Sequence, residues 1–144
     1  MDRKPGEATE AAWIRLSRAQ RVATASIEAR LKAAGLPPLS WYDALWELER
    51  AGEAGLRPFE LERALLFEQY NLSRLADRLE KAGLVERRAV EADRRGQMLT
   101  ITPAGRDLRR RMWAVYAPAI QGAVGDRLSA GEAATLAALL GKLV

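Results

Sequence analysis

The strongest constraint on the fold is a run of about fifty residues in which two amphipathic helical segments precede two β-like segments. The second helical segment, residues 69–83, carries apolar residues at helical spacing: Leu72, Leu75, Leu79 and Ala82. Gly83 is a typical left-handed stop, and residues 84–90 and 98–101 then have strand-like patterns. Two helices followed by a hairpin predict a winged helix-turn-helix, mainly α with a small β-wing.

The side of the 69–83 helix opposite the leucines is polar. It carries side chains that can hydrogen-bond base edges or phosphates: Gln69, Tyr70, Asn71, Ser73, Arg74 and Arg78. The predicted turn of the hairpin, Asp93-Arg94-Arg95-Gly96, adds two arginines. An ion pair of Arg74 with Asp77 or Asp93 is the competing interpretation of that arginine. The pattern predicts a nucleic-acid-binding surface on the helix and the hairpin.

The placement of charge favours the same surface. The net charge is +4, and residues 69–111 contain 11 basic and 6 acidic residues, against 12 basic and 13 acidic residues in the rest of the chain. A charge run alone is often only a solvated surface. Its coincidence with the helix-turn-helix pattern favours a nucleic-acid footprint.

The chain contains no cysteine and no histidine. Their absence excludes disulfides, thiol redox sensing and zinc sites built on these residues, and it removes the usual general base near neutral pH. Carboxylates such as Glu47, Glu49 and Glu53 would be left for catalysis, but they alternate with apolar residues on an ordinary amphipathic helix. We therefore expect neither an enzyme, nor a cofactor, nor a metal site.

Composition indicates a globular chain, with 49% hydrophobic and 29% charged residues. The longest uncharged stretch, residues 112–125, is shorter than a membrane span needs, and the N-terminal residues lack the apolar core of a secretory signal. The expectation is a soluble cytoplasmic protein.

Helical segments flank the winged region on both sides. The first is expected over residues 9–34, capped by Thr9, and a second helix is expected to begin with Ser40 as its cap and Asp43 answering the Ser40 amide. After the hairpin, Thr102-Pro103 should restart a helix that kinks at Pro118. A capping box from Ser129 to Glu132 should open a last helix.

These flanking helices carry more apolar side chains than one small subunit can cover. Each large apolar side chain gains roughly 1.5–3 kcal/mol when it is buried. We therefore expect residues 1–36 and 106–144 to form a helical dimerisation region of a two-fold dimer, around a DNA-binding domain at residues 37–105. The alternative is that these helices fold back on their own winged domain.

The residues described so far resemble the MarR (multiple antibiotic resistance regulator) family of bacterial transcription factors. The resemblance rests on residues 71–87, on Asp93-Arg94-Arg95-Gly96 and on residues 99–105, and residues 39–45 look like the second helix of the family. The most specific part is a helix that ends in Gly-Leu-Val, followed at the right distance by Asp-Arg-Arg and Leu-Thr. The resemblance implies a homodimeric winged-helix regulator of transcription, with repression expected, that binds a pseudo-palindromic operator.

The resemblance also implies how the site residues act. The 69–83 helix would enter the major groove, and the hairpin would reach the adjacent minor groove. Arg95 matches the wing-tip arginine of the family, which gains from the focused negative potential of a narrow minor groove. Asp93 would position the wing through a salt bridge. Residues 59–65 are more charged than the common family form, and the absence of cysteine excludes the thiol-oxidation branch.

Members of this family commonly bind small aromatic or phenolic anions between the dimer helices and the winged domain. The candidates for such a pocket are Trp13, Trp41, Tyr42 and Trp46, with Arg15 or Arg57 for the anion. Core or dimer packing is the alternative role for each aromatic residue. The sequence as a whole predicts a sequence-specific regulator with double-stranded DNA, a second copy of itself and a small aromatic ligand as partners. A non-specific architectural or protein-interaction module is the alternative.

Overall fold

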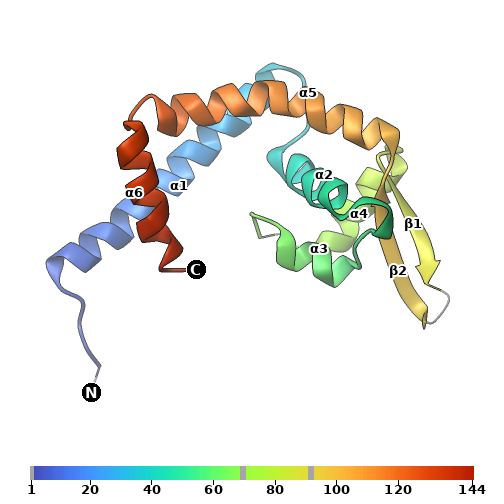
Figure 1. Cartoon of the computed structure of the whole chain (residues 1–144), viewed down its shortest axis with the longest axis horizontal. Helices are drawn as coiled ribbons and strands as arrows, with labels where there is room; N and C mark the ends of the chain where they lie inside the picture. Colours follow the sequence, from blue (N-terminus) through green and yellow to red (C-terminus); the bar gives the residue numbers. More distant parts are fainter. Residues whose placement is uncertain (1, 69–70, 91–92) are drawn as a thin grey trace.

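The computed structural model describes residues 2–68, 71–90 and 93–144. The elements follow in the order α1 (Glu7–Ala33), α2 (Leu39–Ala51), the 3₁₀ helix η1 (Gly52–Ala54), α3 (Pro58–Ala64), α4 (Leu72–Lys81), β1 (Val85–Val90), β2 (Asp93–Ile101), α5 (Pro103–Ile120), the π-helical turn η2 (Gln121–Gly125) and α6 (Ala130–Gly141). Figure 1 shows a winged part, made of α2 to β2, beneath a helical arm made of α1, α5 and α6. The mainly helical fold with a small antiparallel wing is as predicted.

The core of the chain lies where the winged part meets α5 and the C-terminal half of α1. It contains Ile27 and Leu31 of α1 and residues from the winged part and α5, the most deeply buried of which are Leu39, Leu45, Leu48, Leu61, Leu79, Leu99 and Met112. The N-terminal half of α1 and the whole of α6 extend away from this core (Figure 1). Among the described helices, none is long and apolar enough to cross a membrane.

The N-termini of the first two helices differ from the expectation. Gly6, not Thr9, precedes α1, and it makes no side-chain cap. The capping box of Ser40 and Asp43 was wrong, because α2 already begins at Leu39 and Ser40 lies inside its first turn. The Leu39 amide instead donates a hydrogen bond of 2.7 Å to Oε1 of Glu28, so a carboxylate of α1 caps α2.

The wing is a two-stranded antiparallel sheet with a short addition. β1 and β2 pair regularly from Val85 opposite Ile101 to Ala89 opposite Gln97. Leu56 joins the free edge of β2 through two backbone hydrogen bonds with Leu99, of 3.0 and 2.8 Å. This bridge ties the segment before α3 to the wing.

The tip of the wing differs from the predicted basic turn. Asp93-Arg94-Arg95-Gly96 belongs to β2 and is not a turn. The register shifts after Ala89, so that Val90 pairs with Asp93 and residues 94–96 lie in an irregular part of the strand. The sequence pattern suggested a turn because aspartate and glycine are poor strand formers, but pairing with β1 overrides that preference.

Thr102 joins the end of α4 to the start of α5. Its hydroxyl donates a hydrogen bond of 2.7 Å to the Gly83 carbonyl and accepts one of 3.1 Å from the Gly105 amide. The predicted cap at Thr102 and the left-handed stop at Gly83, where φ is 77°, are both confirmed. Thr102 therefore links the C-terminal end of α4 to the N-terminal end of α5, on either side of the wing.

The C-terminal helices begin and end largely as expected. α5 runs through Pro118 and changes to π-helical winding at Gln121. The capping box of α6 is confirmed, with the Ser129 amide 3.0 Å from Oε1 of Glu132 and the Glu132 amide 3.1 Å from Oγ of Ser129.

Candidate nucleic-acid interface and adjoining cavity

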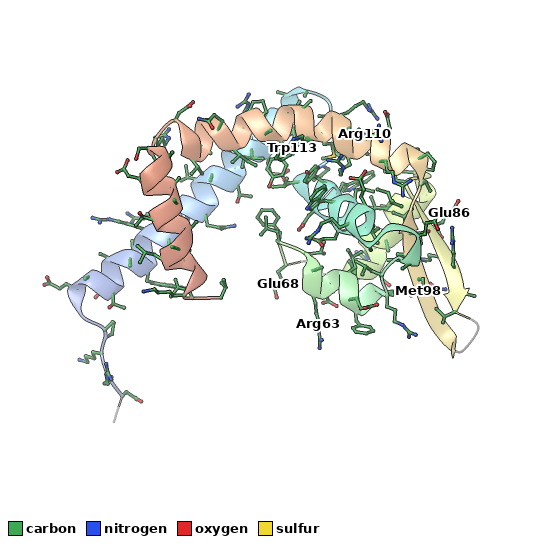
Figure 2. All side chains as sticks on the ribbon, viewed as in Figure 1. Arg63, Glu68, Glu86, Met98, Arg110 and Trp113 are labelled. Carbon is green, nitrogen blue, oxygen red and sulfur yellow. The ribbon has the colours of Figure 1, made fainter. Side chains whose placement is uncertain are left out.

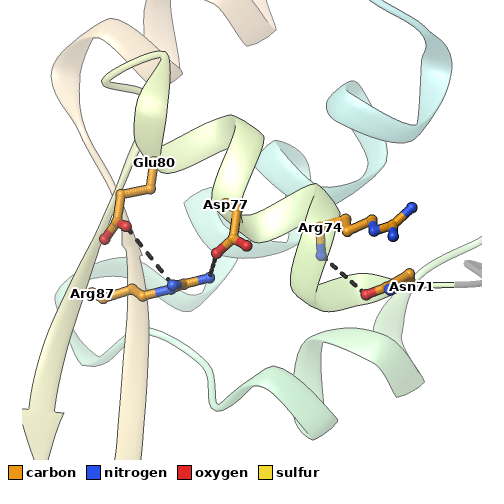
Figure 3. A network of polar contacts seen from close by, with 5 residues as sticks. All are labelled: Asn71, Arg74, Asp77, Glu80 and Arg87. Carbon is orange, nitrogen blue, oxygen red and sulfur yellow. Dashed lines mark hydrogen bonds and ion pairs between the residues drawn. The ribbon is translucent and has the colours of Figure 1, made fainter.

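The buried side of α4 holds the helix against the core. Leu72, Leu75 and Leu79 are buried as predicted, whereas Ala82 is exposed and does not extend the stripe. Asn71 caps the helix, because its Oδ1 accepts a hydrogen bond of 3.1 Å from the Arg74 amide (Figure 3). Asn71 was predicted to contact DNA, but in the structure its side-chain oxygen caps the N-terminus of α4.

The opposite side of α4 presents polar side chains to solvent. Ser73, Arg74 and Arg78 are all exposed. The Arg74 guanidinium points away from Asp77 (Figure 3), and Asp77 is paired with Arg87 instead. Within the described part of the chain, neither Arg74 nor Arg78 has an ion-pair partner. The alternative pairing of Arg74 with Asp77 was wrong, and the side chain of Asp93 lies outside what the structure describes.

An ion-pair network links the wing to α4. The Arg87 guanidinium of β1 lies 2.5 Å from Oδ1 of Asp77 and 3.8 Å from Oε1 of Glu80 (Figure 3). Arg87 is one-quarter exposed and Asp77 is 62% exposed. The pair therefore adds little stability, but it connects β1 to α4 beside the polar side of that helix.

The remaining predicted contact residues are only partly described. Gln69 and Tyr70 lie outside the described residues. For Asp93, Arg94 and Arg95 the structure gives the backbone, which is the start of β2, and not the side chains. The backbone places this basic segment at the far end of the wing, beyond Gln97.

A cavity of about 500 Å³ lies between α2, the segment that follows α3, and α5. It is lined by Leu39, Tyr42, Asp43, Trp46, Glu47, Ala64, Leu66, Phe67, Arg109, Trp113, Tyr116 and Ile120. Tyr42 and Trp46 were among the four predicted pocket aromatics. Trp41 is not part of the lining and is only packed against the core, and Trp13 is 69% exposed on α1. The cationic residue in the wall is Arg109, in place of Arg15 or Arg57.

Aromatic rings of α2 and α5 form one wall of the cavity. The Tyr42 ring meets the Tyr116 ring edge-on, with centroids 4.9 Å apart, and lies nearly parallel to the Trp113 ring at 5.9 Å. Trp113 and Tyr116 meet edge-on at 5.6 Å. Figure 2 shows Trp113 on the side of α5 that faces α2. These contacts give the wall a fixed shape.

Arg109 is held by three neighbours in the same wall. Its guanidinium pairs with the Glu49 carboxylate and lies 5.2 Å from the centroid of the Trp46 ring. It also hydrogen-bonds Tyr42; burial raises the pKa of the Tyr42 phenol, and this bond lowers it in part. With 13% of its side chain exposed, Arg109 is an internal cation of the wall.

Asp43 connects the cavity to the segment before α4. Its Oδ2 accepts a hydrogen bond of 3.0 Å from the Phe67 amide, and the Leu66 amide also donates to this carboxylate. The side chain is buried, and burial raises its pKa, while the two amide donors act in the opposite direction. The Asp43 carboxylate thus accepts hydrogen bonds from the amides of Leu66 and Phe67, which would be bonded to backbone carbonyls in a regular helix or strand.

Sequence reasoning missed Arg87, Arg109, Trp113 and Tyr116 as site residues. Trp113 and Tyr116 are three residues apart on one helix, which is a signal for a shared aromatic face. The carboxylates suggested for catalysis do not converge: Glu49 pairs with Arg109, Glu47 lies 3.4 Å from Arg50, and Glu53 is exposed in η1.

The two short helices, the adjoining β-wing and the long flanking helices define a winged helix-turn-helix protein. A sequence profile of the MarR family matches residues 34–96. The transcriptional repressor MprA of Escherichia coli K12 is 38% identical over 82 residues, which are 57% of this chain and 46% of MprA. The match therefore spans about half the length of this curated relative.

Solved structures extend the similarity over the whole chain. Sco3205, a MarR family transcriptional regulator of Streptomyces coelicolor solved in complex with DNA, has a TM-score of 0.87 and 25% identity, covering 99% of this chain and 89% of that one. A MarR mutant of Escherichia coli complexed with operator DNA has a TM-score of 0.77 and 25% identity over 90% of each chain. Over residues 34–96 the chain is similar to the MarR family, and its fold is that of solved MarR family regulators. The relatives it matches are named as regulators of transcription, in agreement with the class that the sequence predicted.

Proposed function

We propose that the protein is a sequence-specific DNA-binding transcriptional regulator that acts as a homodimer in the bacterial cytoplasm. The observation that carries the proposal is the polar side of α4, where Ser73, Arg74 and Arg78 are exposed next to a wing that is tied to the same helix by Arg87. Exposed guanidinium groups on a helix that is the second of a helix-turn-helix suit phosphates and guanine edges. The DNA complexes of Sco3205 and MarR support this assignment.

In this proposal α4 enters the major groove and the wing follows the backbone toward the minor groove. Gln69, Tyr70 and Ser73 stand near the start of the helix and read bases, while Arg74 and Arg78 contact phosphates or guanine. Arg94 and Arg95 come at the far end of the wing and supply positive charge there, and Asp93 orients them. The winged domain then corresponds to residues 37–105.

The homodimer is supported by apolar side chains that the single chain leaves in water. The helix α6, which is described in full, has no buried residue. Its Leu139 is 54% exposed, and Trp13 and Val22 of α1 are exposed by more than 60%. A two-fold dimer formed by residues 1–36 and 106–144 would cover these groups and hold two copies of α4 about 34 Å apart, one turn of DNA.

Repression is the proposed direction of control, and the name of the relative MprA supports it. The cavity beside Tyr42 and Trp46 is the proposed site for a small aromatic ligand that releases DNA. It touches α2, α5 and the segment leading to α4, so a ligand there would bias the spacing of the two reading helices.

Selection of bound duplexes from a random pool tests the function directly. A palindromic sequence with half-sites one turn apart is expected. If binding to the selected duplex disappears in excess random DNA, the protein is an architectural module and the proposal of sequence-specific control is wrong.

Single substitutions test the surface. Replacement of Arg74 or Arg78 by alanine should weaken binding by about 1–3 kcal/mol and reduce the salt dependence by about one phosphate contact. Arg18→Ala removes the same charge from an exposed position on α1 and serves as the control. Equal losses in all three variants would mean that only net charge matters, contrary to the proposed surface.

The dimer has its own test by analytical ultracentrifugation. Leu139→Glu places a charge on the exposed apolar side of α6 and should shift the protein toward monomer. Phe59→Glu changes a residue of similar exposure on α3 and should leave the mass unchanged. A wild-type chain that sediments as a monomer at micromolar concentration would contradict the dimer.

A further inference from the structure

The charged groups around the cavity are mostly acidic. Asp43 and Glu47 belong to its lining, and Glu49 lies beside them through its pair with Arg109. Among the described residues of the lining, Arg109 is the one cation. The lining holds two carboxylates and one guanidinium, and adding the pairing partners Glu49 and Arg50 leaves the same excess of one negative charge, which disfavours an anionic ligand.

The single cation is already engaged. Arg109 pairs with Glu49, hydrogen-bonds Tyr42 and stacks over Trp46. An anion would have to compete with the Glu49 carboxylate for a guanidinium that is 13% exposed. Breaking a mostly buried pair leaves one charge without compensation, which is costly.

The two carboxylates of the lining, Asp43 and Glu47, are balanced by nearby positive charge less completely than Arg109 is balanced by Glu49. The nearest cation to Glu47 is Arg50, at 3.4 Å, and this arginine is 61% exposed, so water screens the pair. Asp43 is bonded to the neutral amides of Leu66 and Phe67 and, among the described side chains, has no ion-pair partner. Both acids therefore leave negative potential at the cavity.

The aromatic rings of the cavity also attract cations. Tyr42, Trp46, Trp113 and Tyr116 line the cavity together with Phe67. The faces of such rings are negative and attract cations, most strongly when water is displaced. The Arg109 guanidinium over Trp46 shows that a delocalised cation packs well against this wall.

We propose that this cavity binds an aromatic organic cation in preference to an anion of the same shape. The inference rests on the proposed role of the cavity as the ligand site and specifies the charge of the ligand. The bound cation lies against the rings of Tyr42, Trp113 and Tyr116 and is balanced by Glu47 and Asp43. The volume of about 500 Å³ admits a molecule with several phenyl groups.

Two ions of nearly identical shape and opposite charge provide the test. Tetraphenylphosphonium and tetraphenylborate are titrated into the full-length protein, without DNA, by calorimetry. The cation is expected to bind at least about tenfold more tightly, equivalent to about 1.4 kcal/mol. Equal affinity, or tighter binding of tetraphenylborate, would overturn the proposal.

Substitutions locate the binding. Glu47→Gln should weaken tetraphenylphosphonium binding roughly three- to tenfold, because it removes one partly screened charge from the wall. Glu53→Gln removes an exposed carboxylate in η1 and should have no effect. If both variants lose affinity equally, or neither does, the cation is not held in this cavity and the proposal is wrong.

The proposed function is judged by a separate measurement. The affinity for the selected duplex is determined with and without saturating tetraphenylphosphonium. A cation that binds and leaves DNA affinity unchanged counts against the cavity as a regulatory site, while its charge preference stands. If the protein binds no duplex at all, the proposed function as a DNA-binding regulator is wrong. The calorimetric titration is made without DNA, so it still decides whether the cavity prefers the cation.

Discussion

The carboxylate of Asp43 in α2 accepts a hydrogen bond of 3.0 Å from the backbone amide of Phe67, which lies four residues before the cap of α4. The bond connects two parts of the chain that are 24 residues apart. Because Asp43 and Phe67 both line the cavity, we expect a ligand there to act on the segment that precedes α4.

Removal of the Asp43 acceptor should cost stability. In Asp43→Ala the Phe67 amide loses a part-buried hydrogen bond, and the loss should cost about 1–3 kcal/mol. Leu66 is 71% exposed, so its amide adds little to that cost. Asp43→Asn keeps one acceptor oxygen and should lose less. Urea unfolding of the three proteins measures the difference, and an alanine variant as stable as the asparagine variant would show that water replaces the carboxylate.

The pH dependence of stability should reveal the same residue. Burial raises the pKa of Asp43, so the folded state keeps a proton at pH values where the unfolded chain has released it. The free energy of unfolding of the wild type should therefore fall, relative to Asp43→Asn, as pH rises from the ordinary aspartate pKa to the raised one. Urea unfolding between about pH 3 and 7 tests this. A constant difference over that range would mean that the folded and unfolded pKa values are equal.

The link between wing and α4 should matter for DNA binding more than for stability. Arg87→Gln and Asp77→Asn both break the 2.5 Å pair but change the net charge in opposite directions. Each should change the free energy of unfolding by less than about 1 kcal/mol, because Asp77 is exposed. Both should weaken binding to the selected duplex. If Asp77→Asn instead strengthens binding while Arg87→Gln weakens it, charge alone is responsible and the link positions nothing.

Two glycines should respond differently to alanine. A Cβ on Gly83 would meet open space, so Gly83→Ala suffers only from its φ of 77°, at a cost of about 1–2 kcal/mol. A Cβ on Gly105 would collide with the Leu84 carbonyl and lie 2.7 Å from Cγ1 of Ile101, so Gly105→Ala must shift β1 or α5 and should cost more. Thermal unfolding compares them. A smaller loss in Gly105→Ala would show that α5 can move away from the wing.

Local patterns predicted most of the winged part. The spacing of Leu72, Leu75 and Leu79, the stop at Gly83 and the caps at Thr102 and Ser129 all depend on residues within one or two helical turns. The backbone responds to such signals before any tertiary contact forms, and these elements were predicted correctly. The predictions at Thr9 and Ser40 were wrong because several neighbouring residues could have started each helix. For α2, a contact with the distant Glu28 decided which residue did.

The start of α2 illustrates that choice. Ser40 and Asp43 satisfy the spacing of a capping pair, but Glu28 of the preceding helix reaches the Leu39 amide and the helix begins earlier. Asp43 is then free to turn inward and bond Phe67. A carboxylate that reads as a surface cap in the sequence becomes a buried link in the structure.

The sequence by itself determined the winged-helix fold class, the order of the elements and the polar side of α4, because periodicity, capping and charge act over short distances along the chain. Tertiary structure alone decided the cavity and its charge. Whether Arg109 faces Glu49 and Trp46, and whether Trp113 and Tyr116 meet Tyr42, depends on how α5 crosses α2. That crossing follows from the packing of side chains about 60 to 75 residues apart, and no short-range pattern encodes such packing.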